Sequence, residues 1–265
     1  MGVSVVSERP FSQDTWSPLV VAHRGASATE AENTIAAFEA AIGAGADAVE
    51  FDVRLTSDGV PVVIHDADLS RTTDRSGVIA ASTLEEVRAA RIRTRAGTTS
   101  VPTFREVLDA LSGRVAIDVE LKNVPGEPDF EPGGDRLVNA IIDELHDARF
   151  DGDVLISSFD PVALDAVRRR DGDRMTGLLT SPDVDVLAAL TFARDRGHRW
   201  VLPFIDAATD AGPDLVAAAR DASLRIGTWL TDTPSRAVAL FRSGIDAVAT
   251  NDPGPAVVAV REAFA

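Results

Sequence analysis

Two of the four histidines in this 265-residue chain, His23 and His65, each end a short apolar run and precede a charged residue. Between them, Glu50 and Asp52 lie two positions apart, so on a strand both carboxylates point to the same face. Strand ends that bring imidazole and carboxylate groups together are typical of a metal-assisted acid–base site.

The carboxylate pair is hard to explain as part of a solvated surface. The residues that alternate with Glu50 and Asp52 are Val49, Phe51 and Val53, which are apolar. A strand of this kind is buried on both faces in a parallel sheet. Because a buried charge without a partner is strongly unfavourable, the pattern indicates that both carboxylates face a cation or another polar partner.

A third carboxylate, Glu120, ends another strand-like run, and Asp118 has the same parity. Three carboxylates at one end of a sheet would repel one another unless a cation neutralises them. Oxygen ligation favours Mg2+ or Ca2+ over zinc, and Mn2+ is also compatible. We therefore expect one divalent cation near these groups. Asp118 is either a neighbour of the metal or a buried partner for a cationic side chain.

Two cationic residues, Arg24 and Lys122, follow these strand ends, and Lys122 is the single lysine of the chain. A guanidinium group suits phosphate oxygens in particular. The two histidines can share the proton transfers, one as base and the other as acid. A metal, cationic anchors and an acid–base pair together indicate phosphoryl transfer.

Eight continuous, β-branched-rich runs are predicted as strands buried on both faces. They cover residues 19–22, 48–55, 115–120, 154–156, 175–179, 200–203, 225–229 and 247–250. Most are followed by a helical pattern. The alternation predicts an α/β fold, a (βα)8 TIM barrel, whose catalytic groups lie at the C-terminal strand ends.

Capping signals mark the expected helix ends. The starts are predicted at Asn33, at Thr103 in a capping box with Glu106, and at Asp160, Thr233 and Asp252, each followed by proline. Three glycines are expected where helices stop, namely Gly43, Gly45 and Gly244.

The domain organisation is predicted as an N-terminal extension, residues 1–18, and a single barrel domain, residues 19–265. A Ser-Asp-Gly turn at 57–59 predicts a hairpin after the second strand. An insertion at about 69–101 follows it, with one helix near 82–90. Insertions on this side of a barrel usually cover the active site. A second long loop is expected at 124–134.

Composition excludes several classes of protein. The net charge of −16 argues against nucleic-acid binding and against stable association with an anionic membrane. No apolar run reaches the length of a membrane span, and the polar start of the chain does not resemble a signal peptide, so we expect a cytoplasmic location. Nothing indicates the oligomeric state. His146 and His198 are interpreted as surface residues.

With these residues in hand, the chain resembles the glycerophosphodiester phosphodiesterase family. The similarity extends from residue 19 to 255 and is most specific in the first hundred residues. The matching motifs are His23-Arg24-Gly25, Glu32-Asn33-Thr34, Glu50-Phe51-Asp52-Val53, Thr56-Ser57-Asp58-Gly59, His65-Asp66, Leu69-Ser70-Arg71-Thr72-Thr73, Val101-Pro102-Thr103-Phe104 and Glu120-Leu121-Lys122. Looser matches are Ser158-Phe159, Trp229 and Thr250-Asn251-Asp252-Pro253.

The resemblance implies a metal-dependent enzyme that cleaves glycerophosphodiesters to glycerol 3-phosphate and an alcohol. It assigns metal ligation to Glu50, Asp52 and Glu120, and acid–base catalysis to His23 and His65. It further implies that Arg24 and Lys122 contact the phosphate, while Phe159 and Trp229 form walls of the substrate site. The family often has an asparagine shortly after the tryptophan. Here Thr231-Asp232 stands instead, which adds negative charge near the expected pocket.

Two other functions stay open. The first is a phospholipase-type phosphodiesterase built on the same barrel, which would act on lipid in membranes. The second is a non-catalytic barrel that binds a phosphate ligand without turnover. Action on soluble head-group diesters but not on intact lipid separates the first from a glycerophosphodiesterase, and loss of activity in His23→Ala separates the second.

Overall fold

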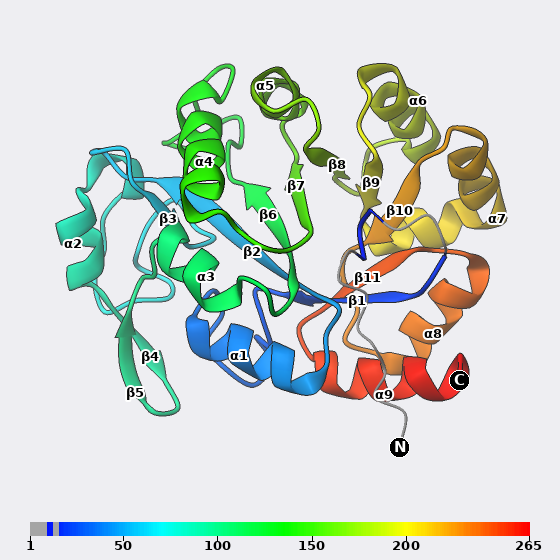
Figure 1. Cartoon of the computed structure of the whole chain (residues 1–265), viewed down its shortest axis with the longest axis horizontal. Coiled ribbons are helices and arrows are strands. Elements are labelled where there is room, and N and C mark those ends of the chain that lie inside the picture. Colours follow the sequence, from blue (N-terminus) through cyan, green and yellow to red (C-terminus); the bar gives the residue numbers. More distant parts are fainter. Residues whose placement is uncertain (1–9, 13–15) are drawn as a thin grey trace.

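The computed structural model of the protein describes residues 10–12 and 16–265. Within them, eight parallel strands close into a barrel because β1 pairs with both β2 and β11, in the registers His23↔Glu50 and Leu19↔Ala247. The barrel strands are β1 (Leu19–His23), β2 (Ala48–Leu55), β6 (Ala116–Leu121), β7 (Val154–Ser158), β8 (Met175–Thr180), β9 (Trp200–Pro203), β10 (Arg225–Thr228) and β11 (Ala247–Thr250). The predicted (βα)8 barrel is confirmed (Figure 1).

Helices surround this barrel, and each except α9, which follows the last strand, lies between one barrel strand and the next. They are α1 (Ile35–Ala44), α3 (Phe104–Leu111), α4 (Asp135–Ala148), α5 (Pro161–Arg170), α6 (Val186–Arg196), α7 (Ile205–Asp221), α8 (Pro234–Ser243) and α9 (Pro253–Ala263). Helix α7 contains a kink, because Gly212 has a non-helical backbone and Pro213 follows it. None of the helices in the described part of the chain is long and apolar enough to cross a membrane.

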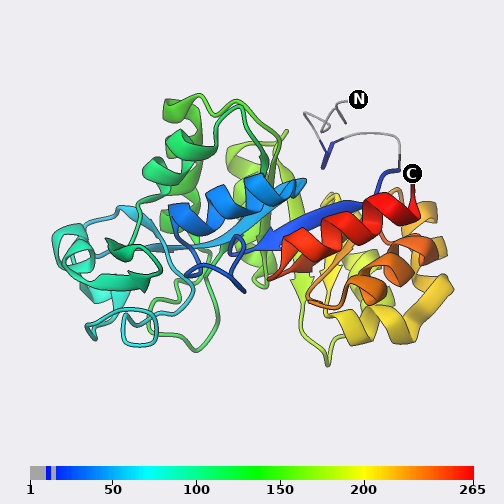
Figure 2. The same ribbon diagram turned by 90° about the horizontal axis from the view of Figure 1, so that it is seen from below.

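The insertion after β2 forms a small lobe on one side of the barrel, as Figure 1 and Figure 2 both show. It contains β3 (Pro61–Val63), a 3-10 turn η1 (Ile79–Ala81), α2 (Leu84–Ala89) and a hairpin of β4 (Arg91–Thr94) and β5 (Gly97–Ser100). Strand β3 runs antiparallel to β2, as the turn at 57–59 predicted. The hairpin β4–β5 was not predicted, since its exposed strand residues are polar.

Buried apolar side chains form three separate clusters. The largest fills the space between the barrel and its helices. A second fills the barrel interior, and Phe11, from the segment before β1, belongs to it together with Trp200. The third lies inside the insertion, around Ile64, Ile79 and Ile92. Because the insertion has a core of its own, the lobe can hold a fixed position beside the strand ends.

Most predicted helix ends are confirmed. Thr103 forms the expected capping box with Glu106, and Asp160 accepts a hydrogen bond from the backbone of Val162. Gly45 and Gly244 end their helices in the left-handed conformation.

Two predicted ends are wrong. Thr34 caps α1 instead of Asn33, because the side chain of Asn33 is turned onto the carboxylate of Asp52. Gly43 lies within α1, which continues to Ala44 before it ends.

Candidate active site

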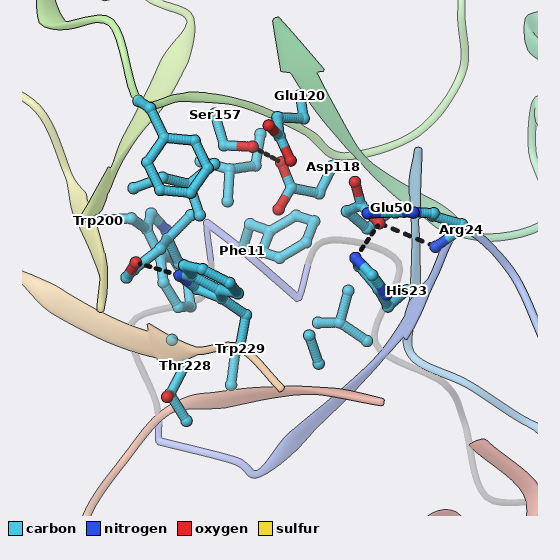
Figure 3. Close-up of a pocket in the computed structure, with 18 of the residues that line it drawn as sticks. Phe11, His23, Arg24, Glu50, Asp118, Glu120, Ser157, Trp200, Thr228 and Trp229 are labelled. Carbon is cyan, nitrogen blue, oxygen red and sulfur yellow. Dashed lines mark hydrogen bonds and ion pairs between the residues drawn. The ribbon is translucent and has the colours of Figure 1, made fainter. Parts of the chain in front are cut away.

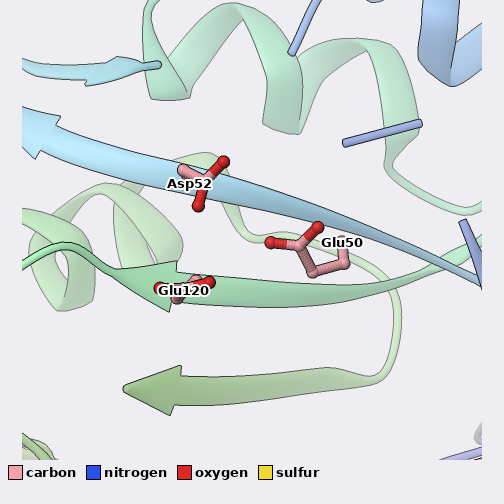
Figure 4. Close-up of side chains that lie close together, drawn as sticks. All are labelled: Glu50, Asp52 and Glu120. Atoms are coloured by element: carbon pink, nitrogen blue, oxygen red, sulfur yellow. The ribbon is translucent and has the colours of Figure 1, made fainter. Parts of the chain in front are cut away.

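Strand register places three carboxylates of β2 and β6 together, beside the C-terminal end of β1. Glu50 is paired with Asp118, and Asp52 with Glu120, so their side chains share one face of the sheet. Glu50, Asp52 and Glu120 are buried, and each offers an oxygen atom within 4.8 Å of the others (Figure 4). This face is the inside of the barrel. The apolar residues that alternate with the carboxylates point outward and pack under the helices, so neither face of the strand is exposed to solvent.

Without a bound cation, these buried carboxylates repel one another. Burial, followed by repulsion from Asp52, Glu120 and Asp118, holds the pKa of Glu50 well above its ordinary value. Glu50 Oε1 is buried and has no hydrogen-bond partner among the described residues. A divalent cation at this position would give Glu50 Oε1 a partner and would replace the proton that the raised pKa of Glu50 favours. The residues present therefore suit a hard metal ion with oxygen ligands.

Two cationic side chains lie beside the carboxylates. Lys122 Nζ is 2.7 Å from Glu120 Oε1 and 3.3 Å from Asp52 Oδ1, and Arg24 Nε is 3.2 Å from Asp52 Oδ2. Burial raises the pKa of the Asp52 carboxyl, but Lys122 and Arg24 outweigh it, so the pKa of Asp52 is lowered. Asp52 is therefore ionised, with both cations close to the position expected for an anionic ligand.

His23 is held by an amide. Its Nδ1 lies 2.8 Å from Asn251 Oδ1, while Asn251 Nδ2 donates to Asp232 Oδ2 at 2.9 Å. Since Asp232 takes the amide NH2 group, the oxygen of Asn251 faces His23 and requires a hydrogen on Nδ1. The lone pair of His23 Nε2 then points into the site, 4.0 Å from Glu50 Oε2 (Figure 3). Burial, followed by the charge of Arg24, lowers the pKa of His23.

The same contacts give a role to Asp232, which was expected to add negative charge near the pocket. Both of its carboxylate oxygens bind Asn251, one at the backbone NH at 2.7 Å and one at the side chain. Asp232 thus acts on His23 through Asn251, a residue that only the loose family match had indicated.

His65 is held by a carboxylate. Its Nδ1 is 2.6 Å from Asp66 Oδ1, and Arg71 donates to the other oxygen of Asp66 at 2.5 Å. Burial opposes ionisation of Asp66, but Arg71 and His65 outweigh it and lower the pKa of Asp66 to about 2. Arg71 also donates to Glu32, which binds Arg24. The two histidines therefore have different partners, a neutral amide and an ionised carboxylate.

Aromatic side chains form the opposite wall of the cavity. Phe159 and Trp229 meet edge to face with 5.5 Å between ring centroids, and Trp229 also packs on Phe204 at 5.1 Å. Eight of the nine predicted site residues line one cavity of about 200 Å³, which continues down the barrel to Phe11 and Trp200 (Figure 3). Asp52 is the exception; it lies behind this surface and contacts Lys122 and Arg24.

Three buried polar residues near the site have partners that sequence reasoning did not identify. Asn33 donates to Asp52 Oδ2 at 2.8 Å and fixes that carboxylate. Asp118 binds Ser157 at 2.7 Å, and burial raises the pKa of Asp118 to about 7. Arg54, on β2 beyond Asp52, is fully buried. The period-two pattern of β2 contained the signal for Arg54, because it shares the inward parity of Glu50 and Asp52.

The other two histidines lie outside the site. His146 is exposed on α4, as expected. The interpretation of His198 as a surface residue is wrong: it is buried, with Nδ1 2.9 Å from the hydroxyl of Thr176. The turn that follows α6 directs His198 inward against β8, which the charged neighbours in the sequence did not reveal. Burial lowers the pKa of His198 to about 4.

The amino-acid sequence matches a known protein family. Residues 23–255 match the model of the glycerophosphoryl diester phosphodiesterase family. A glycerophosphodiester phosphodiesterase of Caldanaerobacter subterraneus subsp. tengcongensis is 31% identical over 252 residues, which cover 92% of this chain and 98% of that protein. The GDPD4 enzyme of Arabidopsis thaliana is 30% identical over 244 residues, 89% of this chain and 71% of that protein.

Solved structures agree with the sequence matches. A phosphodiesterase of Oleispira antarctica, in complex with the product sn-glycerol-3-phosphate, superposes with a TM-score of 0.83 at 26% identity, over 92% of this chain and 97% of that one. A glycerophosphodiester phosphodiesterase of Thermotoga maritima superposes with a TM-score of 0.74 at 25% identity, over 92% and 99% of the two chains.

Proposed function

The chain belongs to the glycerophosphoryl diester phosphodiesterase family, and from this premise we propose that it hydrolyses glycerophosphodiesters to glycerol 3-phosphate and an alcohol. The reaction uses one divalent cation and two histidines. The observation that carries the proposal is the site itself: Glu50, Asp52 and Glu120 share one buried corner with two cations and two oriented imidazoles.

In this proposal, Glu50, Asp52 and Glu120 hold the divalent cation. When bound, the ion neutralises the carboxylates, lowers the pKa of a hydroxyl nucleophile and stabilises negative charge on the phosphoryl oxygens. Magnesium and calcium both suit an all-oxygen site, and manganese is compatible with it.

The chain's own side chains bind and orient the phosphate. Arg24 and Lys122 are charged, converge from β1 and β6 on Asp52, and offer donors to phosphate oxygens. Phe159 and Trp229 cover the opposite side, where the organic part of the diester lies and water is excluded. In this proposal, the scissile P–O bond lies between the two histidines.

The partners of the histidines divide the proton transfers. Asn251 keeps the hydrogen of His23 on Nδ1, so Nε2 is free to accept a proton from the nucleophile, either a glycerol hydroxyl or water. Burial lowers the pKa of His65, and Asp66 beside it acts in the opposite direction. In this proposal Asp66 thereby stabilises the protonated ring, which donates to the oxygen of the leaving alcohol. We therefore assign His23 as the base and His65 as the acid.

A substrate panel with purified protein tests the proposal. Glycerophosphocholine, glycerophosphoethanolamine and diacyl phosphatidylcholine are assayed after chelation and after addition of Mg2+, Ca2+ or Mn2+ in turn. We expect turnover of the two soluble diesters only, with no activity until a cation is returned. Hydrolysis of the diacyl lipid instead would support the phospholipase alternative, and an undiminished rate in the presence of chelator would exclude the metal.

Matched variants check the assigned residues. His23→Ala and Glu50→Gln are each expected to lower kcat by about a hundredfold or more, because they remove the base and a metal ligand. His146→Ala and Glu39→Gln alter exposed residues of the same types and serve as controls. Full activity in His23→Ala would contradict the mechanism. A cytoplasmic location stays a prediction, which fractionation of the producing cells tests.

A further inference from the structure

A second hollow lies beside the catalytic cavity, at the C-terminal end of β8. We call it the β8 groove; it has a volume of about 460 Å³ and lies between α5 and α6, which flank β8 in Figure 1. Its lining is largely apolar and comprises Phe159, Pro161, Leu178, Leu179, Thr180, Ser181, Val184, Asp185, Ala188, Ala189 and Phe192. No residue assigned above to proton transfer or metal ligation lines it.

Apolar residues at this groove are unusually exposed. Val184, a lining residue, is 39% exposed. Val162 and Leu187 are 47% and 43% exposed, and each is a direct chain neighbour of a lining residue, Pro161 or Ala188. The described part of the chain has only two other exposed large apolar side chains, Trp16 at 37% and Val258 at 57%. A largely apolar hollow with an exposed valine in its lining favours an apolar ligand.

The polar groups in the groove do not change this character. The carboxylate of Asp185 accepts hydrogen bonds from the backbone of Leu187 and Ala188, so it serves as the cap of α6. Thr180, at the floor, is 3% exposed, and its hydroxyl has no partner in the described part of the chain. A buried hydroxyl without a partner favours a ligand that brings an oxygen atom next to an apolar chain.

The groove is continuous with the catalytic cavity, which favours part of the substrate over an unrelated molecule as its ligand. Phe159 and Leu179 line both hollows, so the groove begins where the aromatic wall of the catalytic cavity ends. The carboxylates lie on β2 and β6 and the cations follow β1 and β6, whereas the groove lies at β8, on the opposite side of the barrel from β1. A diester whose phosphate sits at the cations would extend its organic part over Phe159 toward the groove.

We propose that the β8 groove binds a single aliphatic chain of the substrate, so that the enzyme also hydrolyses glycerophosphodiesters carrying one such chain. The inference rests on the proposed function and names a substrate class for the same site. The chain is attached either to the glycerol, as in a monoacyl glycerophosphodiester, or to the leaving alcohol. Water supplies the hydroxyl that phosphorus gains and the proton that the leaving oxygen takes, so no other reactant is needed.

Two series of substrates test the proposal, each used below its critical micelle concentration. The first is acyl-glycerophosphocholine with hexanoyl, octanoyl or decanoyl chains, and the second is glycerophosphate esterified to hexanol, octanol or decanol. We expect kcat/KM to rise in one series by about twofold or more for each pair of added methylene groups, since full burial of one methylene is worth about fourfold. The series that responds identifies where the chain is attached.

Variants in the groove separate chain binding from catalysis. Val184→Asp and Ala188→Trp are expected to abolish the rise with chain length, because one places a charge at the rim and the other fills the hollow. Val258→Asp, which alters an exposed valine on α9, is the matched control and is expected to keep the rise. Turnover of glycerophosphocholine within about twofold of the parent shows that each variant is folded.

Each outcome bears on one proposal. Rates that do not depend on chain length in either series, while glycerophosphocholine is hydrolysed, overturn the assignment of the groove and leave the proposed function intact. Equal loss of the rise in Val184→Asp and Val258→Asp also overturns it. Failure to hydrolyse glycerophosphocholine with any cation contradicts the proposed function itself.

Discussion

Arg54 shows how a single buried residue joins distant parts of the site. Its guanidinium donates to the backbone oxygen of His65 at 2.7 Å, to Asp129 at 2.5 Å and to Glu127 at 2.6 Å. The last two belong to the loop after β6, so Arg54 ties that loop to the strand end that carries His65. Asp129 is nearly as buried as Arg54, which makes the pair depend on both partners.

We expect Arg54→Met to lower the free energy of unfolding by about 3 to 5 kcal/mol, because it leaves Asp129 buried without its cation. Loss of the donor to the His65 carbonyl is expected to lower kcat by roughly tenfold through displacement of the imidazole. Urea unfolding and steady-state kinetics measure the two effects.

The double variant Arg54→Met/Asp129→Asn should recover part of the lost stability, since it removes the unpaired charge. Arg105→Met is the control, because Arg105 forms a similarly short ion pair with Glu144 nearer the surface. An equal effect of both arginine substitutions on stability and on kcat would contradict the special position of Arg54.

At the scale of elements, Asp47 connects the beginnings of two strands. It lies between α1 and β2, and its carboxylate accepts a hydrogen bond from the backbone of Val20 in β1 at 2.8 Å. Burial is the largest influence on this carboxyl, and it raises the pKa of Asp47 to about 6 despite the bond from Val20. Asp47 therefore binds a proton more tightly in the folded protein than in the unfolded chain.

A raised pKa makes stability fall as the pH rises. Between about pH 4 and pH 6 the folded protein keeps the proton of Asp47 and the unfolded chain loses it, so the free energy of unfolding declines with pH. Relative to Asp47→Asn, the parent is expected to lose about 1 to 2 kcal/mol across this range. Urea unfolding of both proteins at several pH values measures the difference.

Subtracting the free energy of unfolding of Asp47→Asn from that of the parent at each pH isolates the contribution of Asp47, because all other carboxylates are present in both proteins. Asp246→Asn is not a suitable control, since that carboxylate pairs with two arginines. Glu85→Gln is suitable, because Glu85 is exposed on α2 and forms no ion pair with the described residues. Parallel stability curves for the parent and Asp47→Asn would contradict the prediction.

At the scale of the whole molecule, the chain before β1 completes the barrel. Small side chains on several strands, among them Ala48, Ala116 and Ala247, leave space at the N-terminal end of the barrel interior, and Phe11 occupies it. Its ring packs edge to face on Trp200 at 5.6 Å, and its backbone NH donates to Asp153 at 2.6 Å. The same ring forms the floor of the catalytic cavity.

Truncation of this ring is expected to destabilise the protein. Phe11→Ala should lower the free energy of unfolding by about 3 kcal/mol, because it opens a cavity in the barrel interior. Trp16→Ala removes a larger ring of the same segment that is 37% exposed, and it should cost about 1 kcal/mol or less. Urea unfolding compares them, and a larger effect of Trp16→Ala would contradict the role of Phe11.

Much of the fold was predictable from local sequence. The strands of the barrel were recognised because parallel strands buried on both faces leave continuous apolar runs, and the predicted limits differ from the observed ones by at most two residues. The capping box at Thr103 was also local, since Thr and Glu three residues apart satisfy each other's amides. Asn33 was misjudged because its partner, Asp52, lies on another strand.

The candidate site was predictable in its chemistry but not in its arrangement. The parity of Glu50 and Asp52 required burial, and burial of carboxylates required a cation, so sequence alone determined the kind of chemistry. The family motifs supplied the bond that is broken. None of these patterns indicated that Asp232 would bind Asn251 and so orient His23, because Asp232 follows β10, Asn251 follows β11 and His23 ends β1.

The sequence by itself determined the alternation of strands and helices, the buried carboxylates and the family, because each depends on residues close together in the chain. Only the tertiary structure decided which histidine meets an amide and which a carboxylate, that Phe11 closes the barrel, and that a groove adjoins the catalytic cavity. These features depend on how the closed barrel sets the register between its strands and on how the helices pack around it. Both bring together residues far apart in the chain, which local patterns do not encode.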